Sequence, residues 1–303
     1  MLLKNNYFWR SSNYAIGMAI ELSVIIVNYN VRHFLEQCLC SVQKAIRNIN
    51  TEIIVVDNNS IDNSIGYLKS QFPGIRFLVN DTNLGFAKAC NQGLQLSLGK
   101  YILFLNPDTI VPEKSLEDCI SFFESHPDAG GVGVRMIDIQ NKFLKESKRG
   151  LPTPAASFYK LFGLSAIFPK AKTFSKYYEG HLPENENNPV EVLSGACMMI
   201  RREVFEKING FDERFFMYGE DIDLSIRIIQ AGYKNYYLGT ITVTHLKGGS
   251  TTYNFKYVQD FYGAMNLFVK KHYSNRSILF RTILYSGISI RKIIAQASLL
   301  FNR

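Results

Sequence analysis

From residue 22 onward, short apolar runs alternate with stretches that carry apolar residues at helical spacing. The first run, LSVIIVNYN, is followed by VRHFLEQCLCSVQKAI, in which apolar residues recur every three or four positions. Further strands are predicted at 52–60, 75–80, 101–106 and 130–138, and helices at 61–72 (starting at Ser60), 84–97 and 113–126. Because both faces of each strand are apolar, the pattern predicts an α/β fold with a mostly parallel sheet flanked by helices.

Three of the predicted strands end in polar side chains. Asn28 and Tyr29 follow the first strand, Asp57 follows the second, and Asn106 and Asp108 follow the fourth. Right-handed crossovers bring these ends to one edge of the sheet, where such folds bind ligands. Each acid taken singly is typical of a turn or a helix cap. Both acids at one edge, with Asn28 beside them, favour a shared binding site.

The turns that follow the first strands contain neither GxGxxG nor GxxxxGK[ST]. This absence argues against a simple dinucleotide enzyme and against a P-loop phosphotransferase. If the site binds a nucleotide, a divalent cation held by a carboxylate is the expected means of neutralising the phosphates.

The alternation is lost between residues 138 and 190, a stretch rich in Lys, Pro, Phe, Tyr and Asn. A long irregular insert in a compact domain is usually a functional lid or a mobile loop. Order returns at VEVLSGACMMIRREVFEKI, which predicts a strand followed by a short helix.

Residues 210–233 contain the densest cluster of acids, namely Asp212, Glu213, Glu220, Asp221 and Asp223. The dipole of the helix expected after Gly219 favours acids in its first turn, and Asp223 can pair with Arg227 four residues later. These effects explain one or two of the acids. The aromatic run FFMYG precedes them, and a carboxylate beside apolar walls is poised to act as a general base.

The C-terminal segment is strongly basic. Residues 261–303 contain no Asp or Glu but seven Lys or Arg, and removing these seven from the net charge of +8 leaves +1 for the first 260 residues. Apolar residues at 258, 261, 262, 265, 268 and 269 predict a helix packed on the domain. The apolar run at 282–290 is far shorter than the roughly 20 residues of a membrane span. The segment beyond is typical of a basic amphipathic helix on an anionic membrane surface, with a packed hairpin or a homodimer interface as alternatives.

Other features exclude whole classes of protein. The five cysteines form no CxxC pair, which indicates thiols in a reducing compartment. The basic charge is confined to an apolar tail without any nucleic-acid-binding motif, so we expect no nucleic acid partner. Residues 1–20 lack a long apolar stretch and a cleavage site, and we expect a poorly ordered extension there, not a signal peptide.

Six segments, in this order, together resemble the GT-A-fold, family 2 inverting glycosyltransferases, in particular rhamnosyltransferase-like bacterial members. They are SVIIVNYN, IIVVDNNSIDNS, NLGFAKACNQGL, LFLNPDT, SGACMMIRREVFEKINGFDERFFMYGEDIDLSIRIIQAGY and THLKGGST. The resemblance covers roughly residues 21–255. It implies a GT-A domain over 21–255 with an acceptor-side insert at 138–190, preceded by the extension 1–20 and followed by the helical tail 256–303.

The resemblance also implies residue roles on the donor side. The nucleotide-sugar would be bound by Asn28, Tyr29, Asp57, Asn83, Gly85, Phe86, Lys88, Asn91, Asn106, Lys247 and Ser250. Asp108 would be a ligand of a divalent metal, Mg²⁺ or Mn²⁺. Many relatives have Asp-x-Asp at this point, whereas Asn106 replaces the first acid here, and His245 is the expected compensating ligand. A histidine at a strand end also occurs without any metal, and the family pattern decides for the metal role.

On the acceptor side, the resemblance implies Asp221 as the catalytic base, with Glu220 as the second candidate. Ser194, Gly195 and Ala196 would border the acceptor and the donor sugar, because small residues allow close approach. The implied reaction is transfer of a sugar, with dTDP-rhamnose as the expected donor, to a glycan or lipid-linked glycan in cell-surface polysaccharide synthesis. The implied location is the cytoplasmic face of the inner membrane. UDP- or GDP-linked hexoses and galactofuranose stay open as donors.

Two other functions compete with this enzyme as explanations of the sequence. A catalytically inactive nucleotide- or glycan-binding protein on the same fold would account for Asn106, but the intact GED and THLKGGS segments argue against it. A processive polysaccharide synthase would need membrane-spanning helices and usually a QxxRW segment, and the sequence has neither.

Overall fold

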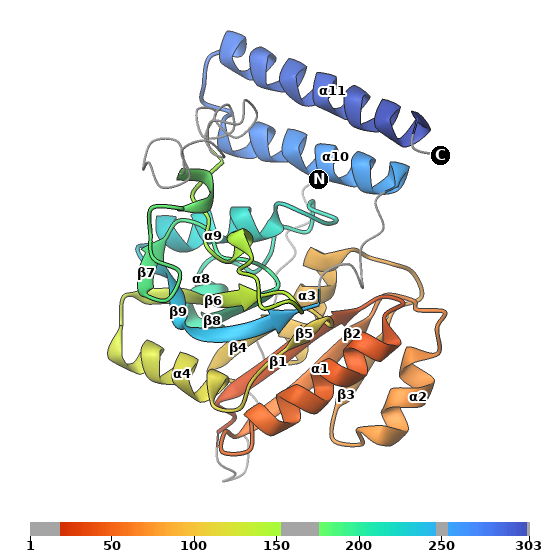
Figure 1. Cartoon of the computed structure of the whole chain (residues 1–303), viewed down its shortest axis with the longest axis vertical. Helices are drawn as coiled ribbons and strands as arrows, with labels where there is room; N and C mark the ends of the chain where they lie inside the picture. The colour runs from red at the N-terminus through yellow and green to blue at the C-terminus, as the bar shows by residue number, and fades with distance from the viewer. Residues whose placement is uncertain (1–18, 153–175, 247–253, 302–303) are drawn as a thin grey trace, which may run out of the picture.

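A computed structural model describes residues 19–152, 176–246 and 254–301 of the chain. These residues form one mixed sheet covered by helices on both faces, with two further helices stacked at one end (Figure 1). The sheet order is β3-β2-β1-β4-β8-β6-β9-β5, and β7 pairs with β9 outside this path. The predicted α/β architecture is confirmed. The predicted extension 1–20 and the middle of the predicted insert lie almost wholly outside the described residues.

The first half of the sheet is parallel, as its sequence pattern predicts. β1 pairs in parallel with β2 and β4, and β2 with β3. The strands of this half are β1 (Leu22–Asn28), β2 (Thr51–Asp57), β3 (Arg76–Val79) and β4 (Tyr101–Leu105). Its helices are α1 (Arg32–Ala45), α2 (Ser64–Gln71), α3 (Phe86–Leu96) and α4 (Ser115–Ser125). The prediction that α2 starts at Ser60 is wrong, because the Ser60 hydroxyl is used by Asn28 and Asp57 instead.

The second half of the sheet is mixed. β8 runs antiparallel to β4 and β6, β5 and β7 run antiparallel to β9, and β6 runs parallel to β9. The strands are β5 (Thr109–Ile110), β6 (Ala129–Ile137), β7 (Asn187–Val190), β8 (Cys197–Arg201) and β9 (Lys234–His245). The helices are η1 (Lys145–Ser147), η2 (Lys176–Tyr178), α8 (Arg202–Lys207) and α9 (Glu220–Gln230).

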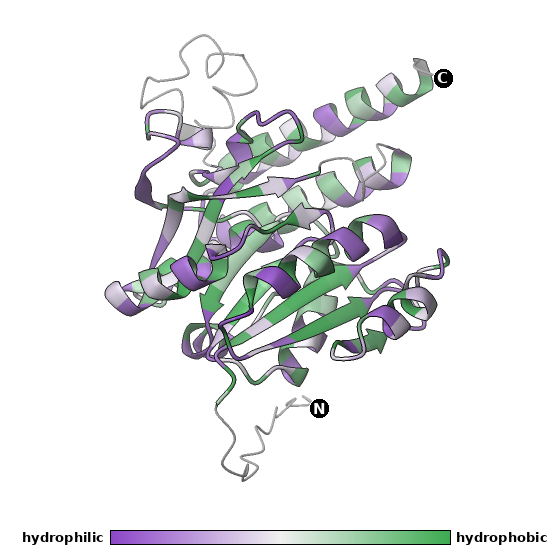
Figure 2. Cartoon of the chain, turned by 60° about the horizontal axis from the view of Figure 1, so that its bottom comes forward, coloured by the Kyte–Doolittle hydropathy of each residue, from purple (hydrophilic) through white to green (hydrophobic). Residues whose placement is uncertain are grey.

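The sheet separates two apolar layers because successive side chains of a strand point to opposite faces. In β1, Leu22, Val24 and Ile26 pack with α1, α2 and α4, whereas Ile25 and Val27 pack with α3, α8 and α9. The hydrophobic strands lie between helices whose outer faces are hydrophilic (Figure 2). This packing holds the carboxyl ends of β1, β2 and β4 side by side.

The C-terminal helices are α10 (Phe255–His272) and α11 (Ile278–Phe301), which lie against each other (Figure 1). Of the predicted apolar stripe, Val258, Phe268 and Val269 are buried, whereas Met265 is 38% exposed. Phe268 packs in a cluster with Phe215. Within the described part of the chain, no helix is both long and apolar enough to cross a bilayer.

Candidate active site at the carboxyl edge of the sheet

The ends of β1 and β2 bring two predicted residues together. Asn28 and Asp57 are register partners, and Asn28 Nδ2 donates to Asp57 Oδ1 at 2.7 Å. Ser60 donates through its Oγ to the same oxygen at 2.6 Å and through its backbone N to Oδ2 at 2.9 Å. Asp57 is buried, and the Oδ1 atom of Asn28 has no hydrogen-bond partner among the described residues. Tyr29 next to them is exposed. The cluster thus has one buried acceptor left for a ligand.

Gly85 has a conformation and surroundings that suit glycine alone. Its φ is +83°, and a Cβ atom there would lie 2.3 Å from the backbone oxygen of Phe216. Phe86 N donates to that oxygen at 2.7 Å, and Asn83 Oδ1 accepts from Gly85 N at 2.9 Å. The segment containing these predicted residues is therefore packed directly against the loop that precedes α9.

Two other predicted nucleotide-binding residues lie differently along α3. Lys88 is exposed. The amide of Asn91 is used by the loop after α8: its Nδ2 donates to the backbone oxygen of Phe211 at 3.0 Å, and its Oδ1 accepts from Phe211 N at 2.9 Å. Packing alone therefore accounts for Asn91, and its role in nucleotide binding stays a prediction.

The predicted metal ligands meet where β5 pairs with β9. Thr109 is the register partner of His245, which places His245 Nε2 at 3.1 Å from Asp108 Oδ1. Asp108 is 2% exposed, and the Nδ1 atom of His245 is buried without a hydrogen-bond partner among the described residues. The side chain of Asn106 is partly exposed, and its backbone N donates to the oxygen of Ala196 at 2.9 Å.

These residues fit a divalent cation that shares its coordination with a ligand. A carboxylate oxygen and an imidazole nitrogen are both metal donors, and Asp108 Oδ1 and His245 Nε2, 3.1 Å apart, are close enough to bind one cation. The described residues hold no group of three or more His, Cys, Asp or Glu that could bind a metal by themselves. Cations at phosphate-binding sites commonly take one or two protein ligands and complete their shell with phosphate oxygens and water.

Asp221, the predicted base, is held by an arginine from a distant part of the chain. The guanidinium of Arg149 forms a salt bridge to Asp221 Oδ2 and donates to the backbone oxygen of Leu193 at 2.9 Å. Gly195 N and Ile222 N donate to the two carboxylate oxygens at 3.2 Å and 2.8 Å. Burial acts to lower the pKa of Arg149, but the charge of Asp221 outweighs it and the net pKa rises. A guanidinium and two backbone N–H groups therefore converge on the Asp221 carboxylate.

The small residues predicted to border the sugars lie next to this carboxylate. A Cβ atom on Gly195 would lie 3.4 Å from the Cβ of Asp221, so the loop passes directly over the carboxylate. Ser194 and Ala196 on either side are buried. Residues 194–196 and Asp221 thus lie together, and their place beside the two sugars stays a prediction.

Glu220 is in a contrasting environment. It is 7% exposed, and its Oε2 atom has no hydrogen-bond partner among the described residues. Burial, followed by the charge of Asp221, raises the pKa of Glu220 to about 8. Tyr218 and Gly219 before it both have positive φ angles, 69° and 80°, which turn the chain sharply into α9. The two neighbouring carboxyl groups therefore lie in different environments, since Asp221 has an ion pair with Arg149 and Glu220 has none among the described residues.

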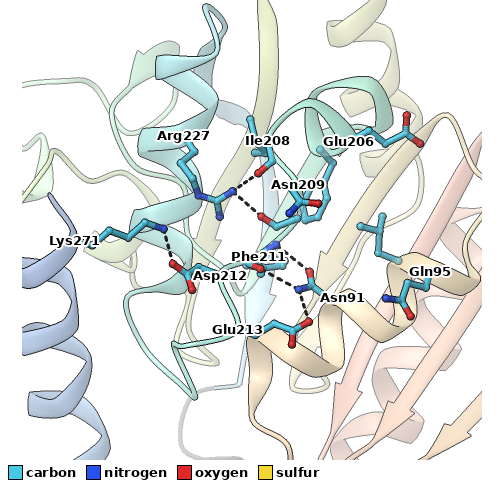
Figure 3. A pocket seen from close by; sticks show the side chains of 13 residues that line it. Asn91, Gln95, Glu206, Ile208, Asn209, Phe211, Asp212, Glu213, Arg227 and Lys271 are labelled. Atoms are coloured by element: carbon cyan, nitrogen blue, oxygen red, sulfur yellow. Dashed lines mark hydrogen bonds and ion pairs between the residues drawn. The ribbon is translucent and has the colours of Figure 1, made fainter. Parts of the chain in front are cut away.

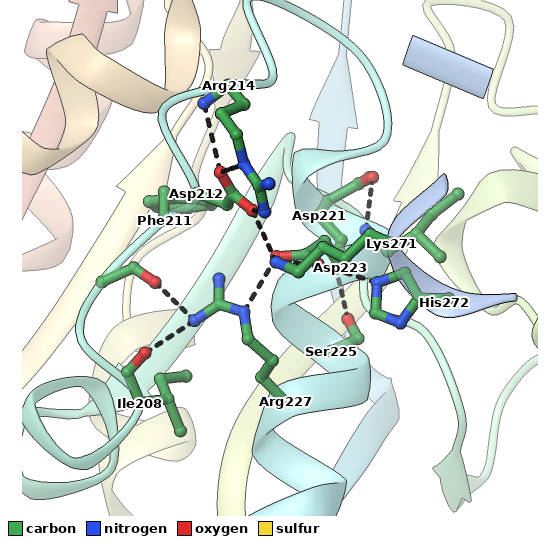
Figure 4. Close-up of polar contacts among 12 residues, drawn as sticks. Ile208, Phe211, Asp212, Arg214, Asp221, Asp223, Ser225, Arg227, Lys271 and His272 are labelled. Carbon is green, nitrogen blue, oxygen red and sulfur yellow. Dashed lines mark hydrogen bonds and ion pairs between the residues drawn. The ribbon is translucent and has the colours of Figure 1, made fainter. Parts of the chain in front are cut away.

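Asp223, one turn further along α9, anchors the helix to α10. It is fully buried and binds Arg227 Nε at 2.8 Å, Lys271 Nζ at 2.6 Å and His272 Nε2 at 2.8 Å (Figure 4). Lys271 also binds Asp212, whose other partner is Arg214. The sequence predicts the Asp223–Arg227 pair but not the two partners on α10. Asp223 and Asp212 are thus structural members of the acid cluster.

A cavity of about 380 Å³ lies between α3 and the segment 205–213 (Figure 3). It is lined by Asn91, Asp212, Arg227, Lys271 and other residues near them, and none of Asp108, Asp221 and His245 lines it. The cavity borders the α9–α10 anchor and not the strand ends. Predicted residues Lys247 and Ser250 lie outside the described residues, so their roles stay predictions.

The model of the family described as "Glycosyl transferase family 2" matches residues 23–209. The chain belongs to glycosyl transferase family 2. A second model, described as "N-terminal domain of galactosyltransferase", matches residues 182–257 of this family 2 member. The two matches together cover residues 23–257, which include every site residue predicted from the sequence.

Among curated relatives of this glycosyltransferase, the N-acetylglucosaminyl-diphospho-decaprenol L-rhamnosyltransferase of Mycobacterium tuberculosis is 28% identical over 246 residues, which are 77% of this chain and 78% of the relative. The rhamnosyltransferase WbbL of Escherichia coli K12 is 32% identical over 145 residues, 48% of this chain and 52% of the relative. The predicted membership of a family with rhamnosyltransferase-like members is thus confirmed.

Solved structures confirm the GT-A type of fold for this family 2 member. S. aureus TarS 1–349 in complex with UDP matches with a TM-score of 0.56 and 17% identity, covering 88% of this chain and 70% of the TarS 1–349 chain. The mannosyltransferase PcManGT from Pyrobaculum calidifontis, in complex with GDP-Man and Mn²⁺, matches with a TM-score of 0.55 and 16% identity, covering 92% of this chain and 73% of PcManGT.

Proposed function

We propose that this glycosyltransferase moves a sugar, with inversion, from a nucleotide diphosphate-sugar to a glycan or lipid-linked glycan acceptor in cell-surface polysaccharide synthesis. The observation that carries the proposal is the backbone bond from Asn106 N to Ala196 O, 2.9 Å long. It joins the segment of Asp108 to the loop whose Gly195 binds Asp221. The segment after β4 that carries Asp108 thereby lies next to the loop before β8 that contacts Asp221.

The residues divide the reaction between them. Asp221 accepts the proton of the acceptor hydroxyl while the hydroxyl oxygen bonds to the anomeric carbon on the face opposite the diphosphate. The bond from the anomeric carbon to the phosphate oxygen breaks, and the nucleoside diphosphate leaves with the electron pair. One displacement inverts the configuration. Asp108 and His245 would hold the divalent cation, which supplies Lewis-acid stabilisation of the leaving group. Mg²⁺ prefers oxygen ligands, so the imidazole of His245 favours Mn²⁺.

The names of the relatives support a choice of donor, acceptor and location. The Mycobacterium tuberculosis relative is named as an L-rhamnosyltransferase acting on N-acetylglucosaminyl-diphospho-decaprenol, and the Escherichia coli relative as a rhamnosyltransferase. We therefore propose dTDP-rhamnose as donor and a lipid-linked glycan as acceptor. An acceptor of this kind would place the enzyme on the cytoplasmic face of the inner membrane.

Thermal unfolding with dTDP, UDP, GDP and ADP, each with and without Mn²⁺ or Mg²⁺, tests the donor site. A ligand at 100 times its Kd adds about 2.7 kcal/mol of stability. We expect the largest upward shift in Tm with dTDP and Mn²⁺, and loss of the Mn²⁺ increment in Asp108→Asn. The exposed Asp118, changed to Asn, is the matched control and should keep it.

Transfer itself is measured with the donor that gives the shift. A metal-dependent nucleotide shift without any sugar transfer or donor hydrolysis would favour the catalytically inactive binding protein. A chain that shifts with none of the four nucleotides would contradict the donor site altogether.

A further inference from the structure

The side of α11 that faces solvent exposes large aliphatic residues, with Thr282, Ser286 and Ser289 between them. Seven large aliphatic residues of this helix are each more than half exposed: Ile278, Leu279, Ile283, Ile290, Ile293, Ile294 and Leu300, with exposed fractions of 54–76%. At about 100° per residue they fall within an arc of about 160°. None of the helix's charged residues, Arg281, Arg291 and Lys292, falls within that arc. We call these seven residues the outer face of α11.

The outer face is not a by-product of packing. Ile288, on the opposite side of the helix, is 8% exposed, so α11 already has a buried seam against the rest of the chain. Exposed aliphatic residues usually occur singly on proteins in water, and a contiguous group of them marks an interaction surface. The exposed fractions above therefore indicate a surface that is covered when the protein works.

The charge around this face distinguishes between occupants. Residues 261–303 carry seven Lys or Arg and no Asp or Glu. A second copy of the chain joined through the same face would bring two such basic segments together, and like charges across an interface are unfavourable. An anionic bilayer offers apolar depth for the outer face and negative headgroups for the basic residues beside it.

We propose that α11 lies in the plane of an anionic membrane surface, with its outer face inserted at the boundary between headgroups and acyl chains. The proposal deepens the membrane location given above but requires neither nucleotide binding nor sugar transfer. α10 lies between α11 and the rest of the molecule (Figure 1), and Lys271 and His272 of α10 bind Asp223 on the helix that begins with Glu220 and Asp221. A bilayer under α11 would thus have a fixed geometry relative to the candidate base.

Co-sedimentation with vesicles of phosphatidylglycerol and phosphatidylcholine, and with vesicles of phosphatidylcholine alone, tests the proposal. We expect the full chain to bind the anionic vesicles and to be released by high salt. Two glutamates on the outer face, in Ile283→Glu/Ile290→Glu, should lower the partition coefficient at least tenfold, because each isoleucine is worth about that factor when buried. Arg276→Gln and Arg291→Gln should each lower it about fivefold.

The matched control is Ile139→Glu, which places one glutamate at an isoleucine that is 66% exposed but lies outside α11, and it is compared with Ile283→Glu alone as well as with the double variant. It should bind vesicles as the unchanged chain does. Thermal unfolding, with and without nucleotide, shows that the variants are folded and keeps this result separate from the donor-site proposal.

Three results would overturn the proposal. The first is a full chain that binds neither kind of vesicle. The second is an equal loss of binding in Ile139→Glu and in the outer-face variant. The third is a dimer, found by light scattering, that the outer-face variant dissociates, because a second copy would then cover this face.

Discussion

Asp223 is the residue through which α9 is attached to α10, and Asp223→Asn tests that attachment. The side chain is fully buried, and Arg227, Lys271 and His272 surround it within 2.8 Å (Figure 4). Asparagine keeps the shape and one acceptor oxygen, but it removes the only charge on the acidic side of this group of four. Lys271 and Arg227 then lose their buried counter-charge.

The loss of stability in Asp223→Asn depends on which partners Arg227 and Lys271 retain. Breaking a buried ion pair by removing one partner typically costs about 3–5 kcal/mol. Arg227 keeps the backbone oxygens of Ile208 and Gly210, at 2.8 Å and 2.7 Å, and Lys271 keeps Asp212 at 2.6 Å. We therefore expect the lower end, about 3 kcal/mol. In a chain of this size that is a fall in Tm of about 6 °C at pH 7.

The effect should depend on pH in a defined direction. Burial raises the pKa of Asp223, but hydrogen bonds from His272 and Lys271 and the charge of Arg227 outweigh it and hold the pKa below its usual range. The stability that Asp223 contributes is therefore complete above the ordinary aspartate pKa and is lost as the pH falls through the lowered value. The difference in Tm between the unchanged chain and Asp223→Asn should shrink below about pH 4.

Thermal unfolding between pH 3 and pH 8 measures this, with Asp118→Asn as the matched control. Asp118 also lies in the first turn of a helix, α4, but it is exposed, so its loss should change Tm by a degree or so. Equal shifts in the two variants would mean that helix-dipole effects, and not the buried group of four, account for Asp223.

Three further outcomes are expected. Asp221→Asn should lower the rate of transfer about 10²–10⁴-fold because it removes the proton acceptor. It also removes the counter-charge of Arg149, so thermal unfolding checks that the variant is folded, and nucleotide binding should be kept. A transfer assay beside a nucleotide titration measures this, and unchanged turnover would rule out Asp221 as the base. Glu220→Gln should stabilise the chain at pH 8 but not at pH 4. Because the pKa of Glu220 is raised, its contribution to the stability of the folded chain is favourable at low pH and is lost as the pH rises towards about 8. Unfolding at the two pH values measures it, and equal shifts would contradict the raised pKa. Gly85→Ala should cost about 1–3 kcal/mol, because the φ of +83° disfavours alanine and its Cβ would meet the Phe216 oxygen; Gly74→Ala, with open space around it, is the control, and equal costs would refute the steric explanation.

The first half of the fold could be predicted because its signals are local. Each of β1, β2 and β4 is a run of apolar residues, and each helix between them repeats every three or four positions. The direction of β8 could not be predicted, because a buried run reads the same in either direction. The two-residue strand β5 is too short to leave a pattern, although its pairing with β9 is what brings His245 to Asp108.

The site residues that lie at the ends of strands could be predicted from the sequence. Asn28 and Asp57 meet because they are register partners in the parallel strands β1 and β2. The alternation of strands and helices already predicts that the ends of these strands lie at one edge of the sheet. Arg149 could not be found in this way. It lies 72 residues from Asp221, inside a segment without periodicity, and only the folded chain shows that its guanidinium reaches the carboxylate. The two partners of Asp223 on α10 are hidden for the same reason.

The contrast between Glu220 and Asp221 now gives a physical reason to prefer one of them as the base. Charging two adjacent carboxyl groups in a buried site costs much free energy. The environment of each group decides which of them carries the charge. Arg149 and two backbone N–H groups contact the Asp221 carboxylate, whereas among the described residues Glu220 forms no ion pair and one of its oxygens has no hydrogen-bond partner. A base has to be held in position before the acceptor arrives, and the contacts to Asp221 do this. Glu220, neutral and buried, instead keeps a second negative charge away from a site that receives a diphosphate.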